Sequence, residues 1–428
     1  MYISRRFILR WGTVFMMSTM LASAFVYFAA DTEAINRRLE AVPYYARTYL
    51  NKFRPKPSAP PPPQVSTIAP EMLLQARSSP GGESEPASDT PALFNEESLN
   101  TTAGTAVEQS PAVPVAAIAP QVSLTGFSHD WQTWNNCGPT TIAMNLSFYG
   151  RAETQVESAQ FLKPNQDDKN VNPEELAAYA RTLGFEATTR VGGNLELLKR
   201  LLSNGLPVIV ETWLDPEDNG GLGHYRLFSG YDEAGRYFLA QDSLRGPEIQ
   251  VDMDEFDQFW RVFNRKYVVV YRPEQAQLVQ AILGPDAMDW AMLERALTAA
   301  QSEARVNPAD PFAWFNIGST YAQLGEPELA ASAFDEARRI GLPYRMLWYQ
   351  FDIFEVYLAV GRYQDVIDLG TATLKATGGL EEIYYYRGLA RLAVDQPEAA
   401  AADFRAALDY NPNFVPAAEA LLALGGSS

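Results

Sequence analysis

The spacing of hydrophobic and polar residues divides the chain into four parts. Residues 1–30 contain an uncharged apolar run, and residues 31–121 are rich in proline, alanine, serine and threonine with little apolar periodicity. Residues 122–274 show helical spacing first and strand-like alternation afterwards, and residues 284–426 are helical in pattern throughout. We therefore predict a terminal apolar segment, a disordered linker and two folded domains.

The first folded domain is predicted to be α+β. Helices are expected from Cys137 to Tyr149, from Pro173 with Asn172 as its cap, and from Asn194 to Ser203. Later apolar stretches alternate as strands do, at Pro207–Trp213, His224–Tyr231, Tyr237–Asp242, Glu248–Val251 and Lys266–Tyr271. Helices that precede a run of closely spaced strands predict a helix layer packed on a mostly antiparallel sheet.

The last third of the chain repeats with a period of about 35 residues, close to the tetratricopeptide signature. One copy reads Trp314-Phe-Asn-Ile-Gly-Ser-Thr-Tyr321 and continues with Ala330 to Phe334 and Pro343. A second copy has Gly388, Phe404 and Pro412 at the corresponding positions. The middle copy, residues 348–374, departs from the signature. We predict about three and a half helix pairs in a short all-α solenoid, whose concave face binds a protein partner.

The N-terminal segment has the features of a membrane anchor. Arg5, Arg6 and Arg10 precede an uncharged apolar stretch at residues 11–30, which is long enough to span roughly 30 Å as a helix. Arginines on this side predict a cytoplasmic N-terminus and extracytoplasmic C-terminal domains, in a single-pass protein of the cell membrane. The alternative is a signal peptide cleaved near Ala22-Ser-Ala24, which would release a secreted protein.

Composition narrows the possible functions. The net charge is −18, which disfavours nucleic acid as a partner. One cysteine in 428 residues cannot form a disulfide within the chain. No phosphate-binding glycine-lysine loop is present, so no ATPase module is expected. Asp167 to Asn170 lacks the ligand spacing of an EF-hand, and we expect a solvated loop, no metal and no cofactor.

The single cysteine stands where a nucleophile would. Cys137 begins the first predicted helix of the α+β domain, where backbone N–H groups and the helix dipole stabilise a thiolate. His224 follows a glycine-rich loop, and Asp242 ends the strand after it. Cysteine, histidine and a carboxylate in these roles are the groups that thiol-dependent acyl transfer requires. The other histidine, His129, lies on the loop before Cys137, and we expect it not to be catalytic.

Residues 124–273 resemble the papain-like cysteine peptidases related to the bacteriocin-processing, double-glycine leader peptidases. The resemblance rests on Gln132, the Cys137-Gly-Pro helix start, the Gly-His224 strand and Asp242. It implies that Cys137 is the nucleophile, His224 the base, Asp242 the orienting residue and Gln132 the oxyanion donor. Two departures stand out: only four residues separate Gln132 from Cys137, and Ser243 replaces the usual proline. Asn135 or Asn136 is an alternative donor.

Three functions are compatible with these residues. The first is an exported cysteine peptidase that hydrolyses peptide bonds, with repeats that recruit a substrate or partner. The others are a non-catalytic peptide-binding scaffold on the same fold and a transglutaminase-like acyltransferase. The acidic loop Asp215 to Asp218 is compatible with a basic peptide or with simple solvation. Because the four candidate residues precede Pro273, we expect residues 124–273 to fold and react without the repeats.

Overall fold

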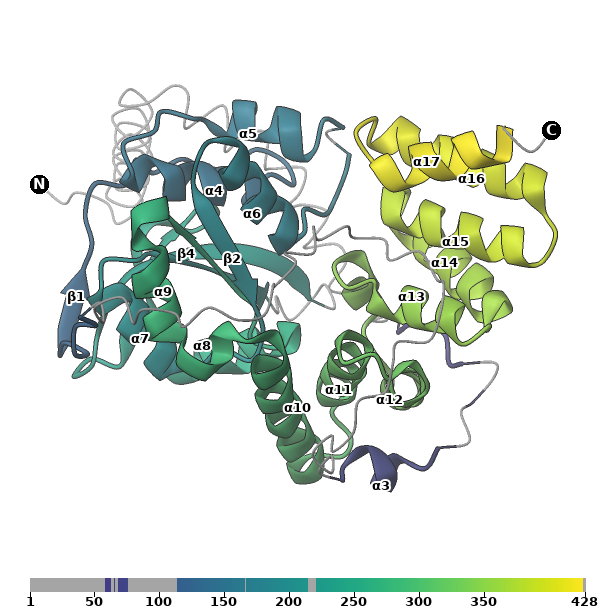
Figure 1. Cartoon of the computed structure of the whole chain (residues 1–428), viewed down its shortest axis with the longest axis horizontal. Helices are drawn as coiled ribbons and strands as arrows, with labels where there is room; N and C mark the ends of the chain where they lie inside the picture. Colours follow the sequence, from purple (N-terminus) through teal and green to yellow (C-terminus); the bar gives the residue numbers. More distant parts are fainter. Residues whose placement is uncertain are drawn as a thin grey trace, which may run out of the picture.

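The alternating apolar segments form one antiparallel sheet between residues 121 and 271 (Figure 1). Its strand order is β2-β7-β3-β4-β5-β6, and β1 pairs with β4 at one side of this path. The strands are β1 (Gln121–Ser123), β2 (Glu186–Arg190), β3 (Val208–Leu214), β4 (Leu222–Asp232), β5 (Tyr237–Asp242), β6 (Gly246–Asp252) and β7 (Tyr267–Tyr271). The adjacent strands β3 and β4 lie inside the sheet and are buried along nearly all of their length.

The computed structural model describes residues 58–62, 65, 68–75, 114–165, 167–214 and 221–425. No helix within these ranges is both long and apolar enough to cross a membrane. The predicted anchor at residues 1–30 lies outside them, and so does the acidic loop Asp215 to Asp218.

Helices cover both faces of the sheet because successive strand residues point to opposite sides. On one face, Ile209 packs with Ile142 and Leu176 from the helices before the sheet. On the other face, Val208 and Val210 pack against the later helices. The first layer consists of α4 (Cys137–Phe148), α5 (Gln155–Leu162) and α6 (Pro173–Thr182), and the second of α7 (Leu195–Ser203), α8 (Met253–Trp260) and α9 (Ala276–Leu283).

The predicted α+β class is confirmed, and the expected strands lie within two residues of β3 to β7. The strand β2 was missed because Glu186-Ala-Thr-Thr-Arg190 is mostly polar and contains no alternating large apolar residues. This composition suits its place at the edge of the sheet, where it pairs with β7 alone.

The last third of the chain is an all-α solenoid, as predicted (Figure 1). Its helices are α10 (Asp289–Val306), α11 (Pro311–Gln323), α12 (Pro327–Ile340), α13 (Asp352–Ala359), α14 (Tyr363–Thr377), α15 (Glu381–Ala393), α16 (Pro397–Tyr410) and α17 (Val415–Gly425). The repeated glycines allow close helix packing, since a Cβ at Gly318 would lie 2.6 Å from the Phe334 ring. Gly388 and Phe404 repeat this contact at 2.5 Å.

The degenerate middle repeat differs from its neighbours at its start. A 3₁₀ segment, Tyr344–Trp348, precedes α13, which is only 8 residues long. Tyr349, Gln350 and Phe351 therefore form an irregular connection where the other repeats begin a regular helix. This connection faces the α+β domain.

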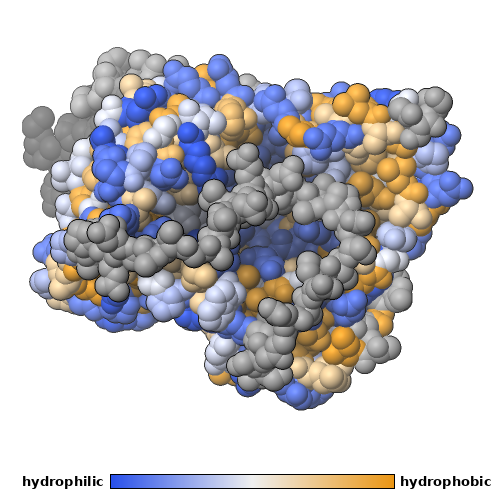
Figure 2. Space-filling model, viewed as in Figure 1, coloured by the Kyte–Doolittle hydropathy of each residue, from blue (hydrophilic) through white to orange (hydrophobic). Residues whose placement is uncertain are grey.

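The two domains share a buried boundary. Trp213 and Phe263 of the α+β domain belong to the same apolar cluster as the repeats, and the Tyr349 ring lies 6.4 Å and 6.1 Å from them. Polar contacts cross the boundary too: Asn264 Nδ2 donates to Thr320 Oγ1 at 3.0 Å. In the view of Figure 2, hydrophilic residues lie in the hollow between the two domains. The two domains therefore pack against each other, and the folding and reactivity of residues 124–273 without the repeats stay a prediction.

Part of the predicted linker has defined contacts with the repeats, which corrects the expectation of disorder throughout residues 31–121. Ala59 and Leu73 are buried in the apolar cluster of the solenoid. The Ala59 N–H donates to the Leu342 carbonyl at 2.8 Å, and Gln301 Nε2 donates to the Leu73 carbonyl at 2.8 Å. The apolar residues around the short helix α3 (Pro70–Leu73) provide the surface that makes this ordering favourable.

Candidate active site

The candidate nucleophile lies at the start of α4, as predicted. Cys137 is the first residue of this helix and is partly exposed. The preceding Asn136 is buried, and Asn135 has a positive φ of 53°, a left-handed conformation that asparagine tolerates better than most residues. The turn at these two residues brings the chain from the approach loop into the helix and leaves the thiol at its N-terminal end.

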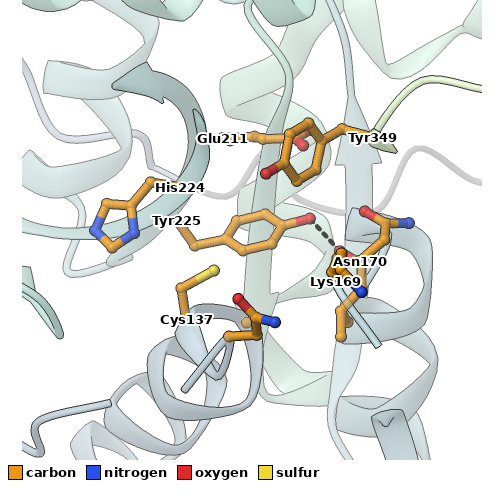
Figure 3. Close-up of a pocket in the computed structure, with 11 residues that line it drawn as sticks. Cys137, Lys169, Asn170, Glu211, His224, Tyr225 and Tyr349 are labelled. Carbon is orange, nitrogen blue, oxygen red and sulfur yellow. Dashed lines mark hydrogen bonds between the residues drawn. The ribbon is translucent and has the colours of Figure 1, made fainter. Parts of the chain in front are cut away.

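His224 and Asp242 come from neighbouring strands. His224 lies near the start of β4 and Asp242 ends β5, and both side chains are buried. His224 Nε2 lies 2.9 Å from Asp242 Oδ1. Because Nε2 is engaged in this way, Nδ1 is the ring nitrogen left for the cysteine. Cys137 and His224 line the same pocket (Figure 3), and the His224 side chain acts on the pKa of the thiol.

Electrostatics at this triad favour a charged pair. Burial alone would raise the pKa of the Cys137 thiol, but the hydrogen bond and charge of His224, with the Tyr225 backbone N–H, outweigh it and lower that pKa. Burial alone would lower the pKa of His224, but the Asp242 carboxylate and Cys137 raise it to about 9. Both shifts favour a thiolate beside an imidazolium.

Asp242 is held as an anion by several donors. Arg226 Nε lies 3.0 Å from its second oxygen, and the backbone N–H groups of Leu244 and Arg245 donate to its first at 2.9 Å and 3.0 Å. Burial would raise the pKa of Asp242, but the charges of His224 and Arg226 and these hydrogen bonds keep it well below its usual range. The carboxylate therefore fixes the orientation of the His224 ring and stabilises its positive charge.

Gln132 lies beside the triad through its contacts with Ser243. Its N–H donates to the Ser243 carbonyl at 3.0 Å, and its side-chain oxygen accepts from Ser243 Oγ at 2.8 Å. The serine that replaces the usual proline thus ties Gln132 to the residue after Asp242. With the side-chain oxygen engaged, the amide N–H groups of Gln132 remain for an oxyanion, and this role stays a prediction.

A pocket opens over Cys137 and His224, and one of its walls comes from the repeats. Figure 3 shows Tyr225 and Tyr349 along it, with Asn170 opposite. Tyr349 packs closely on the chain before His224, since a Cβ at Gly223 would lie 3.0 Å from its ring. The sequence did not indicate this contact, which adds a residue of the repeats to the wall of the pocket.

Two further residues shape the site and were missed. Gln155 Oε1 accepts hydrogen bonds from Asn136 Nδ2 at 2.8 Å and from the Thr133 N–H at 2.9 Å, so it holds the loop before the nucleophile. Lys163 Nζ donates to the Asn135 carbonyl at 3.0 Å, and its charge helps to lower the pKa of Cys137. The buried polar character of both residues is a consequence of tertiary packing that no local pattern reveals.

The loop expected to be solvated is largely buried. Asp168 and Asn170 are 1% and 6% exposed, and Asn170 Nδ2 donates to Glu382 Oε1 of the repeats at 3.1 Å. Within the described residues, no group of three or more histidine, cysteine or acidic side chains is arranged to hold a metal ion. The loop therefore serves as a contact between the two domains and as one wall of the pocket.

His129 does not line the pocket. Its ring lies edge-on to Trp131, with centroids 5.2 Å apart, and burial lowers its pKa. Its exclusion from the catalytic set remains a prediction.

Known protein families match both the α+β domain and the repeats. Residues 120–268 match the peptidase C39-like family, and residues 313–339 match a tetratricopeptide repeat. A search of curated protein sequences gives no significant match.

Several solved structures resemble the α+β domain. A C39-like peptidase from Bacillus anthracis shares 19% identity over 36% of this chain and 98% of its own, with a TM-score of 0.31. A double glycine motif protease from an AMS/PCAT transporter, solved with the leader peptide, shares 20% identity over 36% of this chain and 98% of its own, with a TM-score of 0.27. The peptidase domain of Streptococcus ComA shares 16% identity over 35% of this chain and 99% of its own, with a TM-score of 0.28. On the family matches, the chain contains a peptidase C39-like domain followed by tetratricopeptide repeats.

Proposed function

We propose that this protein is a cysteine peptidase that hydrolyses peptide bonds through Cys137, His224 and Asp242. The observation that carries the proposal is the grouping of thiol, imidazole and buried carboxylate: Cys137 and His224 line one pocket, and His224 Nε2 lies 2.9 Å from Asp242 Oδ1. The position of the thiol at a helix start and in a pocket supports it, because a substrate carbonyl can approach the sulfur there.

In this proposal the Cys137 thiolate attacks the carbonyl carbon of the scissile bond. The His224 imidazolium then protonates the departing amine, and the resulting neutral ring removes a proton from the water that hydrolyses the acyl-enzyme. Asp242 keeps Nδ1 aimed at the sulfur by holding Nε2. Backbone N–H groups at the start of α4 and the Gln132 amide are the proposed donors to the tetrahedral oxyanion.

Incubation with a mixture of peptides of random sequence tests this function. We expect new N-termini, identified by mass spectrometry, with the wild-type protein and none with Cys137→Ser. Addition of a labelled primary amine separates hydrolysis from acyl transfer, because a transferase attaches the label to the acyl group, either at a new C-terminus or on a glutamine side chain with loss of ammonia. Peptide binding without cleavage in both proteins would favour the scaffold function instead and would contradict the proposal.

We also propose that the repeats recruit a protein partner or substrate and that residues 11–30 anchor the chain in a membrane. The solenoid packs on the pocket through Tyr349, so a partner bound to it would be held close to Cys137. Alkaline extraction of membranes tests the anchor: the full chain should stay in the pellet. Release of the full-length chain into the soluble fraction would contradict anchoring.

A further inference from the structure

Glu211 is a buried carboxyl in the pocket that the proposed mechanism does not use. It lies within β3, is 3% exposed, and lines the same pocket as Cys137 and His224 (Figure 3). Its Oε2 atom is buried and has no hydrogen-bond partner. Buried polar atoms are rarely left unsatisfied, because the loss of hydration is costly. An unsatisfied oxygen at a pocket wall therefore points to a ligand group that completes it.

The charges around Glu211 leave room for one more cation. Lys266 is the positive group that acts on Glu211, while Glu174 and the Cys137 thiolate repel its negative charge. The same lysine also faces Asp352 of the repeats, and its Nζ lies 3.6 Å from Glu174 Oε1. The Lys266 ammonium is thus shared by three carboxyl groups, and a positively charged ligand group would pair with the excess negative charge that forms when all three ionise.

The pocket walls beside Glu211 are aromatic. Tyr225 is the residue of β4 directly opposite Glu211, and its hydroxyl donates to the Val171 carbonyl at 2.7 Å. Tyr349 of the repeats lines the same pocket. Organic cations bind favourably against aromatic rings when a carboxylate supplies the opposite charge.

We propose that Glu211, with Tyr349 from the repeats, forms a subsite beside Cys137 that binds an organic cation of the substrate. The chemistry recognised is an ammonium or guanidinium group, from a lysine or arginine side chain or from a peptide N-terminus. As a substrate subsite it rests on the proposed peptidase function, but the charge selectivity at Cys137 can be measured without any hydrolysis.

The preference of the subsite for a cation should increase with pH. Burial raises the pKa of Glu211 to about 8; Lys266 opposes this rise, whereas Glu174 and Cys137 add to it. In the free protein the carboxyl is therefore mostly uncharged at neutral pH. The preference for a cation should grow as the pH rises through 8 and Glu211 ionises.

Charge-selective thiol reagents test the subsite on the full-length protein. Cationic aminoethyl methanethiosulfonate and its neutral hydroxyethyl analogue are similar in size, so the ratio of their rates with Cys137 reports the local charge. We expect Glu211→Gln to lower this ratio about fivefold above pH 8, the size expected for one charge removed near the sulfur. Thermal melting confirms that the variant is folded.

Glu175→Gln is the matched control, because it removes a buried carboxyl of similar pKa that lies outside the pocket. Burial raises the pKa of Glu175 to about 8 as well, yet this residue does not line the pocket, and glutamine can still accept the Asn172 N–H. The ratio should stay near the wild-type value in this variant. An unchanged ratio in Glu211→Gln, or an equal fall in both variants, would overturn the subsite.

Cleavage of a peptide mixture distinguishes the sources of the cation. A lysine or arginine enriched at one position relative to the cut, and lost in Glu211→Gln, identifies a side chain. Cuts at a fixed distance from the N-terminus that disappear when it is acetylated identify the terminal amine. Cuts with neither dependence would contradict the subsite. If the wild type makes no cut at all, the peptidase proposal fails, and the reagent ratio still decides whether the cation subsite exists.

Discussion

Asp242 controls the charge state of the candidate site because it accepts hydrogen bonds from His224 and from three further donors. It accepts from His224, Arg226 and two backbone N–H groups in a buried position. Sequence alone could find Cys137, His224 and Asp242, since cysteine and histidine are rare in this chain and stand at element ends. Gln155 and Glu211 could not be found in this way, because glutamine and glutamate are common and their roles arise from distant contacts.

Asp242→Asn should raise the pKa of the Cys137 thiol. Without the carboxylate, His224 loses the charge that offsets its burial, and its imidazolium no longer stabilises the thiolate. We expect alkylation of Cys137 by iodoacetamide at neutral pH to slow about tenfold or more, as a shift of one pKa unit would produce. His129→Gln is the control and should change the rate less than about twofold; an equal loss there would mean that the base is assigned wrongly.

The repeated glycines explain why the solenoid could be recognised from sequence. Gly318 and Gly388 each pack under a phenylalanine from the next helix, so the same contact recurs with the same residue types. The connection before α13 has no such pattern. The contact of Tyr349 with the pocket follows from this irregular connection, and no sequence pattern predicts it. The strand β2 was missed for a related reason, since edge strands need fewer apolar residues.

Gly388→Ala should destabilise the protein, because the added Cβ would lie 2.5 Å from the Phe404 ring. Overpacking of this kind costs about 1–3 kcal/mol in the free energy of unfolding. Gly370→Ala, in α14, is the matched control: its Cβ would meet Ile383 at an acceptable 3.4 Å, and alanine favours the helix. Urea unfolding of both variants checks this, and equal midpoints would contradict the packing described here.

Carboxyl groups at the boundary between the two domains couple the folding of the whole molecule to pH. Burial raises the pKa of Glu382 to about 8, and Asp168 and Glu175 across the boundary add to the effect. Between the ordinary pKa of 4.5 and 8 the native state keeps a proton that the unfolded chain has released, so stability falls as the pH rises. His224 acts in the same direction, because its pKa rises from 6.5 to about 9 on folding. Its contribution to the stability of the fold is complete below pH 6.5 and is lost as the pH rises through about 9.

We therefore expect the melting temperature of the full chain to decrease from about pH 5 to pH 8. Glu382→Gln should flatten this decrease, because glutamine keeps an acceptor for Asn170 and does not ionise. The difference should reach on the order of 1 kcal/mol at the upper end of the range. Scanning calorimetry at several pH values measures it. Parallel curves for the two proteins would show that the Glu382 carboxyl does not titrate at this boundary.

The pH dependence of Cys137 alkylation, compared between the wild type and His224→Ala, tests most directly whether a thiolate–imidazolium pair exists. Burial raises the pKa of the thiol and His224 lowers it, so removal of the imidazole leaves burial unopposed. The wild-type midpoint should lie below the ordinary thiol value of about 8.5, and that of His224→Ala should lie above it. Superimposable profiles, with a midpoint at or above that value in both proteins, would contradict the account.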